Sequence, residues 1–254
     1  MSTQNKIALV TGGSRGLGKN MALRLADYGN DVILTYHSHK EDANAVAAEI
    51  EGKGKKAAVI QYDSSDFQSL DLFLQRVAQT LKEKWNTDKF DFLINNAGIG
   101  ATIPFAEVTE EDFDRFLDIH FKSVYFLTQR ALPAMNDNGR IINISTGTTR
   151  FANPGYSVYA SMKGAIEVLT RYVAKEVGAR GITVNVVAPG PIETDFNNAA
   201  IRNNPERKKI LSTLTALGRV GEAEDIGGVI AFLCSEDARW ISGQRIEVSG
   251  GINL

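Results

Sequence analysis

The chain has 254 residues, of which 43% are hydrophobic and 23% are charged, and its formal net charge is −2. A chain of this length can bury one sizeable core, and its mixture of both charge signs gives no basic surface for nucleic acid or anionic membranes. No stretch approaches the roughly 18 consecutive apolar residues of a membrane span. The N-terminal residues lack the features of a secretory leader, and Cys234 is the single cysteine, which excludes an internal disulfide. We therefore expect a cytoplasmic protein with one domain over residues 1–254 and neither a nucleic-acid nor a membrane partner.

Short apolar runs rich in β-branched residues alternate with segments of helical period along the whole chain. The runs predict seven strands, at residues 6–10, 31–36, 56–62, 92–95, 140–144, 182–188 and 244–248. The helical segments cover residues 18–27, 41–51, 67–83, 110–135, 156–177 and 223–235. Thr109 and Asp112 form a capping-box pattern at the start of the fourth helix. Alternation of this kind predicts an α/β Rossmann fold, in which a doubly wound, seven-stranded parallel sheet has helices on both faces.

Residues typical of binding sites follow four of the predicted strands. Gly12 and Gly13 follow the first strand, Asn95 to Gly98 end the fourth, Ser145 and Thr146 follow the fifth, and Pro189 and Gly190 follow the sixth. In a doubly wound sheet the carboxyl ends of the strands share one edge, and ligands bind in the crevice outside that edge. The sequence therefore predicts one site built from all four segments.

The segment GGSRGLG joins the first strand to the first helix. Its glycines at 12, 16 and 18 would expose backbone N–H groups and a helix N-terminus to a pyrophosphate. The spacing differs from the commoner G-x-G-x-x-G fingerprint, and a tight turn alone would also explain glycines here. Because a strand precedes the loop and a helix follows it, we favour dinucleotide binding.

Charge at the end of the second strand indicates which dinucleotide is bound. A carboxylate about 20 residues after the glycines would accept hydrogen bonds from an NAD ribose, but no carboxylate occurs in this region before Glu41. Arg15 within the glycine loop adds a permanent positive charge, which would favour a 2′-phosphate. We therefore predict NADP(H) in preference to NAD(H), although Arg15 and Lys40 are also consistent with ordinary surface cations.

Tyr159 and Lys163 lie four residues apart in a predicted helix and therefore share one face. A nearby ammonium favours the phenolate and would lower the tyrosine pKa from about 10. The pair is thus suited to acid/base chemistry, although a half-buried ring beside a solvated amine would give the same spacing.

The combination of TGGSRGLG, NNAG, a hydroxyl residue thirteen places before the tyrosine of Y-x-x-x-K, and PG after the sixth strand resembles the short-chain dehydrogenase/reductase family. The resemblance extends from residue 6 to residue 251. GRIINIS, GITVNVVAPGPIETDF and ALGRVGEAEDIG are most similar to reductases of the 3-oxoacyl-carrier-protein reductase type. The family implies an oxidoreductase that transfers hydride between NADPH and a carbonyl or alcohol.

The resemblance also implies roles for matching residues. Tyr159 would be the general acid/base, and Lys163 would hold the nicotinamide ribose and lower the tyrosine pKa. Asn95, Gly98 and Asp63 would lie on the adenosine side, and Ile192 and Thr194 would hold the carboxamide. The full set of expected cofactor-binding residues is Gly12, Ser14, Arg15, Gly16, Leu17, Gly18, Tyr36, His37, Ser38, Asp63, Ser64, Asn95, Ala97, Gly98, Tyr159, Lys163, Pro189, Gly190, Ile192 and Thr194.

Two positions depart from the family pattern. Thr146 occupies the usual serine position, and Ser145 precedes it. Because consecutive strand side chains point in opposite directions, we choose Thr146 as the catalytic hydroxyl and keep Ser145 as the alternative. His120 replaces the asparagine of the family's proton relay, and an imidazole that titrates near pH 6.5 would add a step to the pH–rate profile. A packing role for His120 is equally consistent with the sequence.

We predict a carbonyl reductase or, in reverse, an alcohol dehydrogenase, with residues 191–217 closing over a small-molecule substrate. The family implies a homotetramer. The alternatives are a 3-oxoacyl-carrier-protein reductase and a dinucleotide-sensing regulator without catalysis. No metal site is expected, because the H-x-H at His37 and His39 lacks a third ligand nearby.

Overall fold

A seven-stranded parallel sheet with the order β3-β2-β1-β4-β5-β6-β7 forms the centre of the protein. The structure is a computed structural model and describes residues 5–254. The strands are β1 Ile7–Val10, β2 Asp31–Tyr36, β3 Ala57–Gln61, β4 Phe90–Asn95, β5 Met135–Ile144, β6 Thr183–Pro189 and β7 Arg245–Val248. Every strand pair is parallel, and the strand order reverses direction at β1. The predicted doubly wound fold is confirmed.

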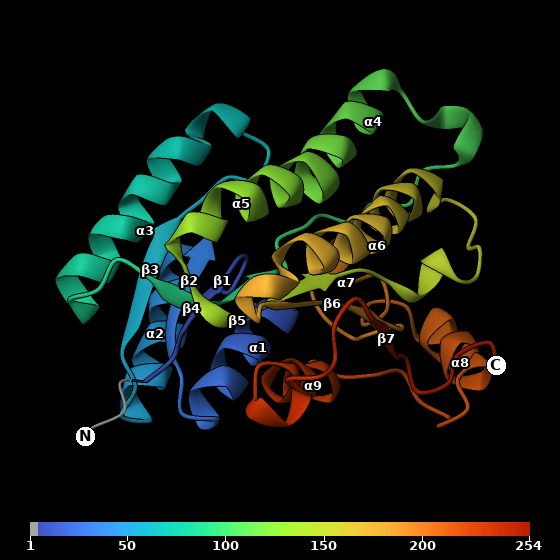
Figure 1. Cartoon of the computed structure of the whole chain (residues 1–254). Coiled ribbons are helices and arrows are strands. Elements are labelled where there is room, and N and C mark those ends of the chain that lie inside the picture. Colours follow the sequence, from blue (N-terminus) through green and yellow to red (C-terminus); the bar gives the residue numbers. More distant parts are fainter. Residues whose placement is uncertain (1–4) are drawn as a thin grey trace.

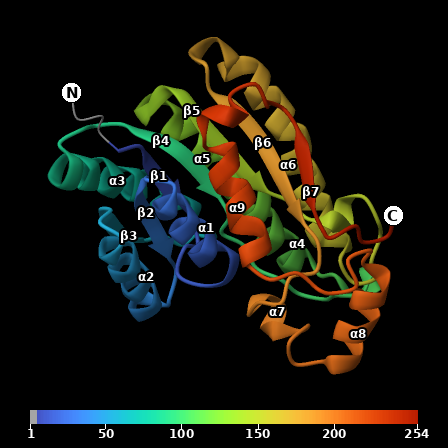
Figure 2. The ribbon, with the colours of Figure 1, turned by 90° about the horizontal axis from the view of Figure 1, so that it is seen from below.

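Helices cover both faces of the sheet, as Figure 1 shows. The α-helices are α1 Gly16–Asp27, α2 Lys40–Gly52, α3 Leu70–Trp85, α4 Glu110–Leu117, α5 Ser123–Ala131, α6 Ser157–Val177, α7 Phe196–Ala199, α8 Pro205–Leu214 and α9 Glu224–Leu233. Apolar residues of α1, α2 and α9 pack on one face and those of α3, α5 and α6 on the other. Turned by 90°, the ribbon shows α7 and α8 beyond the end of the sheet (Figure 2).

Cys234 ends α9 and lies in the core on the α1, α2 and α9 face, where its side chain is 5% exposed. Burial raises the pKa of its thiol to about 12, although the Arg140 charge opposes this shift.

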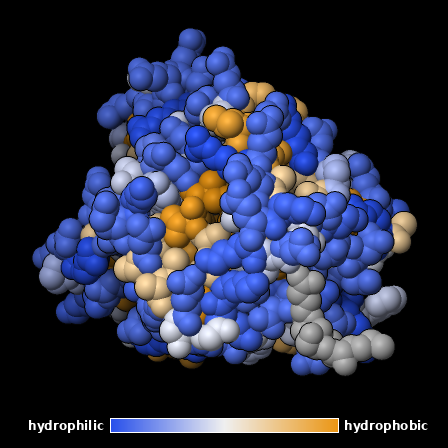
Figure 3. Space-filling model, turned by 90° about the vertical axis from the view of Figure 1, so that its left-hand side faces the viewer, coloured by the Kyte–Doolittle hydropathy of each residue, from blue (hydrophilic) through white to orange (hydrophobic). Residues whose placement is uncertain are grey.

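The surface of the protein is mainly polar on the side shown in Figure 3. This face is largely hydrophilic, with apolar side chains gathered near its middle. No helix within residues 5–254 is long and apolar enough to span a bilayer.

The fourth predicted helix differs most from the structure. Thr109 and Asp112 do form the predicted capping box. The expected single helix over 110–135 is wrong, because a π-helical turn at Asp118–Lys122 separates α4 from α5. A 3₁₀ turn at Leu132–Ala134, with Pro133 near its start, then leads into β5. Proline cannot continue the backbone hydrogen-bond ladder, and this explains why the helix ends before Met135.

Candidate active site

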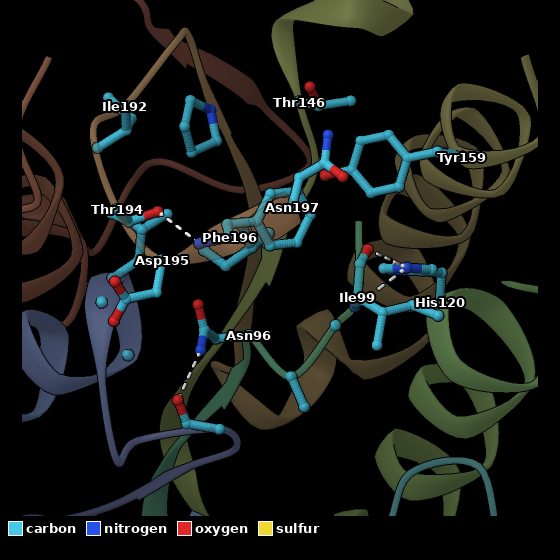
Figure 4. Close-up of a pocket in the computed structure, with 18 of the residues that line it drawn as sticks. Asn96, Ile99, His120, Thr146, Tyr159, Ile192, Thr194, Asp195, Phe196 and Asn197 are labelled. Carbon is cyan, nitrogen blue, oxygen red and sulfur yellow. Dashed lines mark hydrogen bonds between the residues drawn. The ribbon is translucent and has the colours of Figure 1, made fainter. Parts of the chain in front are cut away.

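A cavity of about 480 Å³ lies at the carboxyl edge of the sheet (Figure 4). All but one of the sequence-predicted site residues line it. Additional lining residues come from the loop after β4, from α4 and from the segment that carries α7 and α8. The four strand-end segments identified from the sequence therefore converge on one cavity, as expected for a doubly wound sheet.

The glycine-rich loop is fixed between its neighbouring strands. The Gly12 N–H donates to the Thr35 hydroxyl at 3.0 Å, and the Asn96 amide donates to the carbonyl oxygens of Thr11 at 2.9 Å and Gly12 at 3.2 Å. Gly12 has a left-handed φ of +66°, and a Cβ at Gly18 would lie 2.0 Å from the Gly12 oxygen. Only glycine permits both this conformation and this close approach. The N-terminus of α1 thus points into the cavity on a rigid turn, a geometry that fits a pyrophosphate.

Asn95 is the one predicted site residue that the structure places outside the cavity. Its amide nitrogen donates to Thr128 at 3.0 Å and to Asn143 at 2.8 Å, and it is 4% exposed. The expectation that Asn95 lines the adenosine side is wrong, because alternate strand residues point to opposite faces and its side chain points toward α5. Asn96 lines the cavity instead.

The adenosine end of the cavity contains one carboxylate, and that carboxylate already has partners. Asp63 accepts hydrogen bonds from the Ser65 N–H at 2.9 Å and the Ser65 hydroxyl at 2.6 Å, and its Oδ2 lies 3.3 Å from His37 Nε2. Burial acts to raise the pKa of Asp63, but the contacts with Ser65 and His37 outweigh it and lower the pKa. Arg15, by contrast, is exposed at the N-cap of α1 and has no ion-pair partner within residues 5–254. This end is therefore suited to an additional phosphate.

Tyr159, Lys163 and Thr146 meet where β5 approaches α6. Tyr159 and Lys163 lie four residues, or about one helical turn, apart on α6 and are 9% and 4% exposed. Lys163 Nζ donates to the carbonyl oxygen of Ile144 at 2.8 Å and lies 5.8 Å from the centroid of the Tyr159 ring. The end of β5 thus fixes the ammonium and places the Thr146 hydroxyl beside the phenol.

The predicted lowering of the Tyr159 pKa by Lys163 is not what the structure shows. Burial raises the pKa of Tyr159 above its usual value, and the hydrogen bond with Thr146 opposes this only in part. Burial also lowers the pKa of Lys163 to about 8. The ammonium faces the tyrosine ring and binds a backbone carbonyl, so desolvation dominates for both groups. Tyr159 is consequently a protonated donor at neutral pH.

Thr146 and Ser145 both line the cavity but have different hydrogen-bond partners. The Ser145 hydroxyl donates to Glu167 at 2.6 Å. Thr146 accepts a hydrogen bond from the Thr148 N–H at 3.3 Å and interacts with Tyr159. The structure therefore brings Thr146, not Ser145, to the tyrosine.

His120 lies in the π-helical turn and is 1% exposed. Its ring packs 5.4 Å from Phe116 and 5.1 Å, edge to face, from Tyr159. Its Nε2 is 2.9 Å from the Ile99 carbonyl oxygen, so Nε2 carries the proton and donates it there. Figure 4 shows this contact beside Tyr159.

The expected titration of His120 within the working pH range is contradicted. Burial and the nearby charge of Lys163 hold its pKa well below 6.5, although the bond to Ile99 opposes this. His120 is thus neutral at pH 7. Its buried Nδ1 has no hydrogen-bond partner within residues 5–254 and remains an acceptor.

The last strand-end segment leads from β6 into the part of the chain that overhangs the cavity. Pro189, Gly190, Ile192 and Thr194 all line the cavity. A Cβ built on Gly16 would lie 3.7 Å from Thr194, so this segment passes directly over the glycine loop. We call residues 191–217 the lid, and it contains α7 and α8.

Several cavity residues were missed from the sequence. Phe196 in the lid lies 6.0 Å from the ring of Tyr159, and Asn197 faces the cavity beside it (Figure 4). Tyr156, three residues before Tyr159 and on the same helical face, was detectable from spacing alone. Arg207 on α8 and Arg115 on α4 had no local signal, because only the tertiary fold brings them to the cavity.

His37 and His39 do not converge. His37 contacts Asp63, whereas His39 Nδ1 lies 3.6 Å from Asp42. Within residues 5–254 no three His, Cys, Asp or Glu side chains gather in a way that could hold a metal ion.

Comparison with known proteins agrees with this geometry. The family model described as enoyl-(acyl carrier protein) reductase matches residues 12–253. The chain is 37% identical over 251 residues to a 3-oxoacyl-[acyl-carrier-protein] reductase, FabG, of Staphylococcus aureus, covering 98% of both chains. Among solved structures it resembles the angucycline C-6 ketoreductase LanV with bound NADP, at 40% identity and a TM-score of 0.94, covering 98% of this chain and 96% of that one. It also resembles the reductase LugOII, which catalyses keto-reduction at C1 during lugdunomycin biosynthesis, at 39% identity, a TM-score of 0.93 and 98% coverage of both chains.

Proposed function

The chain belongs to the short-chain dehydrogenase/reductase family, and we propose that it is an NADPH-dependent carbonyl reductase, acting in reverse as an alcohol dehydrogenase. One observation carries the proposal: the Tyr159 phenol lies in the strand-end cavity, with the Thr146 hydroxyl beside it and Lys163 one helical turn away. A group of this kind can donate a proton to a carbonyl oxygen at neutral pH.

The residues of the chain take the following roles in the proposal. A nicotinamide dinucleotide bound along the strand edge supplies or accepts the hydride. Thr146 orients the substrate oxygen, and Tyr159 donates the proton to it in reduction and removes it in oxidation. Lys163, fixed by Ile144, binds the nicotinamide ribose. His120 acts as a neutral acceptor through Nδ1 and does not titrate during turnover.

The preference for NADP(H) rests on Arg15 and on the satisfied carboxylate of Asp63 at the adenosine end. The NADP in the LanV structure supports it. Arg15→Ala tests it, because the change removes a charge-assisted contact that only the 2′-phosphate makes. We expect NADPH binding to weaken about 10- to 100-fold and NADH binding to change little. An equal loss for both cofactors would leave Arg15 as a surface cation.

A ketone is the proposed substrate, with a 3-oxoacyl thioester as the alternative that the FabG relative supports. LanV and LugOII are ketoreductases, and the lining of this cavity includes the aromatic rings of Phe196 and Phe151. NADPH oxidation with a panel of aromatic ketones and with acetoacetyl thioesters separates the two. Cofactor binding without turnover of any compound would instead favour a dinucleotide-sensing regulator.

The quaternary state and the location of the protein are also part of the proposal. Trp240, Leu254 and Tyr172 are 96%, 95% and 66% exposed, and large apolar side chains of this exposure favour association. We propose a homotetramer in the cytoplasm, and light scattering coupled to size-exclusion chromatography tests the tetramer.

A further inference from the structure

Arg207 differs from the cations that surround it on the lid. Arg202 pairs with Asp195, and Lys208 pairs with Glu193 at 2.5 Å. Arg207 lines the cavity and is half-buried, but no carboxylate within residues 5–254 pairs with it. A partly desolvated guanidinium without an acidic partner is favourably placed to bind an anion.

The position of Arg207 relative to the proposed proton donor is fixed by a tyrosine. Its Nη2 donates to the Tyr156 hydroxyl at 2.8 Å, and Asn197 Nδ2 donates to the same oxygen at 3.1 Å. The Thr102 hydroxyl lies 3.3 Å from that oxygen, so the cluster joins the lid to the loop after β4. Tyr156 and Tyr159 are on one face of α6 with ring centroids 6.3 Å apart. The guanidinium is therefore held against Tyr156, whose ring neighbours that of Tyr159 in the same cavity.

The charged residues that line the cavity also favour an anionic ligand. Arg115 on α4 lines the cavity and also has no ion-pair partner in the described part of the chain. The carboxylates in the lining are Asp63, at the adenosine end, and Asp195, which Arg202 neutralises. The lining also contains the apolar side chains of Ile99, Phe151, Phe196, Leu211 and Ile252. The substrate end thus combines apolar walls with an excess of positive charge.

We propose that Arg207 forms a subsite for a negatively charged oxygen group of the substrate, in the same cavity as the Tyr159 phenol. The inference rests on the proposed reductase function and names its substrate class: flat, mainly apolar ketones that carry an acidic group. Charge-assisted, bidentate binding of a carboxylate is the chemistry that a guanidinium provides best.

The test compares two probes of the same shape, 4-acetylbenzoate and its uncharged methyl ester. The wild type should have a higher kcat/KM for the acid than for the ester. Arg207→Gln should lower kcat/KM for the acid about 10- to 100-fold, mainly through KM, and change the ester less than about threefold. Arg207→Lys should restore part of the activity on the acid, and Tyr156→Phe should give an intermediate loss. Equal losses on acid and ester in Arg207→Gln would overturn the subsite.

Lys208→Gln is the matched control, because it removes a cation from the adjacent position on the same helix, one that pairs with Glu193 outside the cavity lining. It should leave the acid-to-ester ratio unchanged. A binding measurement separates this inference from the reductase proposal. If neither probe is reduced, the reductase proposal fails for these ketones, while calorimetric titration of both probes into the enzyme–NADP⁺ complex still tests the subsite. The anion subsite is supported if the wild type binds the acid more tightly than the ester and Arg207→Gln loses this preference. It is overturned if neither probe binds, or if acid and ester bind equally.

Discussion

The catalytic corner, formed by Thr146, Tyr159, Lys163 and His120, and the lid over it are built in opposite ways. No corner side chain is more than 9% exposed, and each is fixed by the end of β5, by α6 or by the π-helical turn. In the lid, α8 has no buried residue, and the apolar side chain of Ile210 is 60% exposed. The lid contacts the rest of the cavity partly through the hydrogen bonds to Tyr156.

This difference indicates how the protein divides its tasks. Buried groups hold their orientation and their perturbed pKa values, which proton transfer requires. A segment with few buried contacts opens at low free-energy cost, which substrate entry requires. We therefore expect changes in the corner to act on every substrate through kcat, and changes in the lid to act on selected substrates through KM.

The largest effect is expected for Tyr159→Phe. The variant keeps the ring and its packing but removes the proposed proton donor, so kcat should fall about 10²- to 10⁴-fold for every ketone. NADPH affinity, measured by fluorescence titration, should change little. A loss in kcat that differs strongly among ketones would contradict the expectation that residues of the corner act on every substrate alike.

The second prediction concerns the pH dependence of stability at Lys163. Its folded pKa of about 8 lies below the usual 10.5, so between these values the unfolded chain binds more protons and stability rises with pH. Burial of the charged amine destabilises the fold fully below about pH 8, by about 3 kcal/mol. Urea unfolding should show this gain between about pH 8 and about pH 10.5 in the wild type but not in Lys163→Met. Lys208→Met, in the exposed lid, should retain the wild-type gain.

A third prediction separates two adjacent hydroxyls. Thr146→Ala should lower kcat about 10- to 100-fold, because it removes the hydroxyl next to the phenol. Ser145→Ala leaves that hydroxyl in place and removes only the bond to Glu167, so the loss in kcat should be much smaller. The reverse order of damage would assign the substrate contact to Ser145.

A lid substitution should behave differently. Phe196 is 43% exposed and packs near Tyr159, so Phe196→Ala should cost about 1 kcal/mol, or roughly fivefold in KM, for ketones large enough to touch it. Small ketones should be unaffected. Steady-state kinetics with one large and one small ketone tests this. An equal loss in kcat for both ketones would mean that Phe196 acts on catalysis, as the corner residues do, and not on the choice of substrate.

The smallest effect is expected for His120→Asn. Because the histidine is already neutral at pH 7, the profiles of kcat against pH should have the same shape in both proteins from about pH 6 to about pH 9. A step near pH 6.5 in the wild type that disappears in the variant would contradict the buried, neutral assignment.

Local patterns in the sequence were sufficient to predict the architecture of the fold. Periodicity identified all seven strands, and the Thr109–Asp112 spacing identified the start of α4. Thr146, and not Ser145, makes the hydrogen bond with Tyr159, a difference that the local rule of alternation along a strand anticipates. Residues whose positions depend on strands or helices alone could therefore be anticipated.

Features that depend on tertiary contacts could not be predicted in this way. The π-helical turn packs against α6, and it has no proline or glycine to mark it in the sequence. The rise in the Tyr159 pKa depends on how fully the fold buries the ring. Arg207 reaches Tyr156 across 51 residues of sequence, and no spacing rule connects two such positions.

Chemical labelling of the buried Cys234 reports the unfolding of the protein without an added probe. A thiol-specific reagent needs an exposed thiolate, and the folded chain supplies neither exposure nor ionisation at this single cysteine. The rate of labelling therefore measures how often the α1, α2 and α9 core opens. Thr213→Cys would add a second, exposed thiol on α8, whose labelling rate gives the value for an accessible thiol in the same molecule, so that the ratio of the two rates reports how often the core opens.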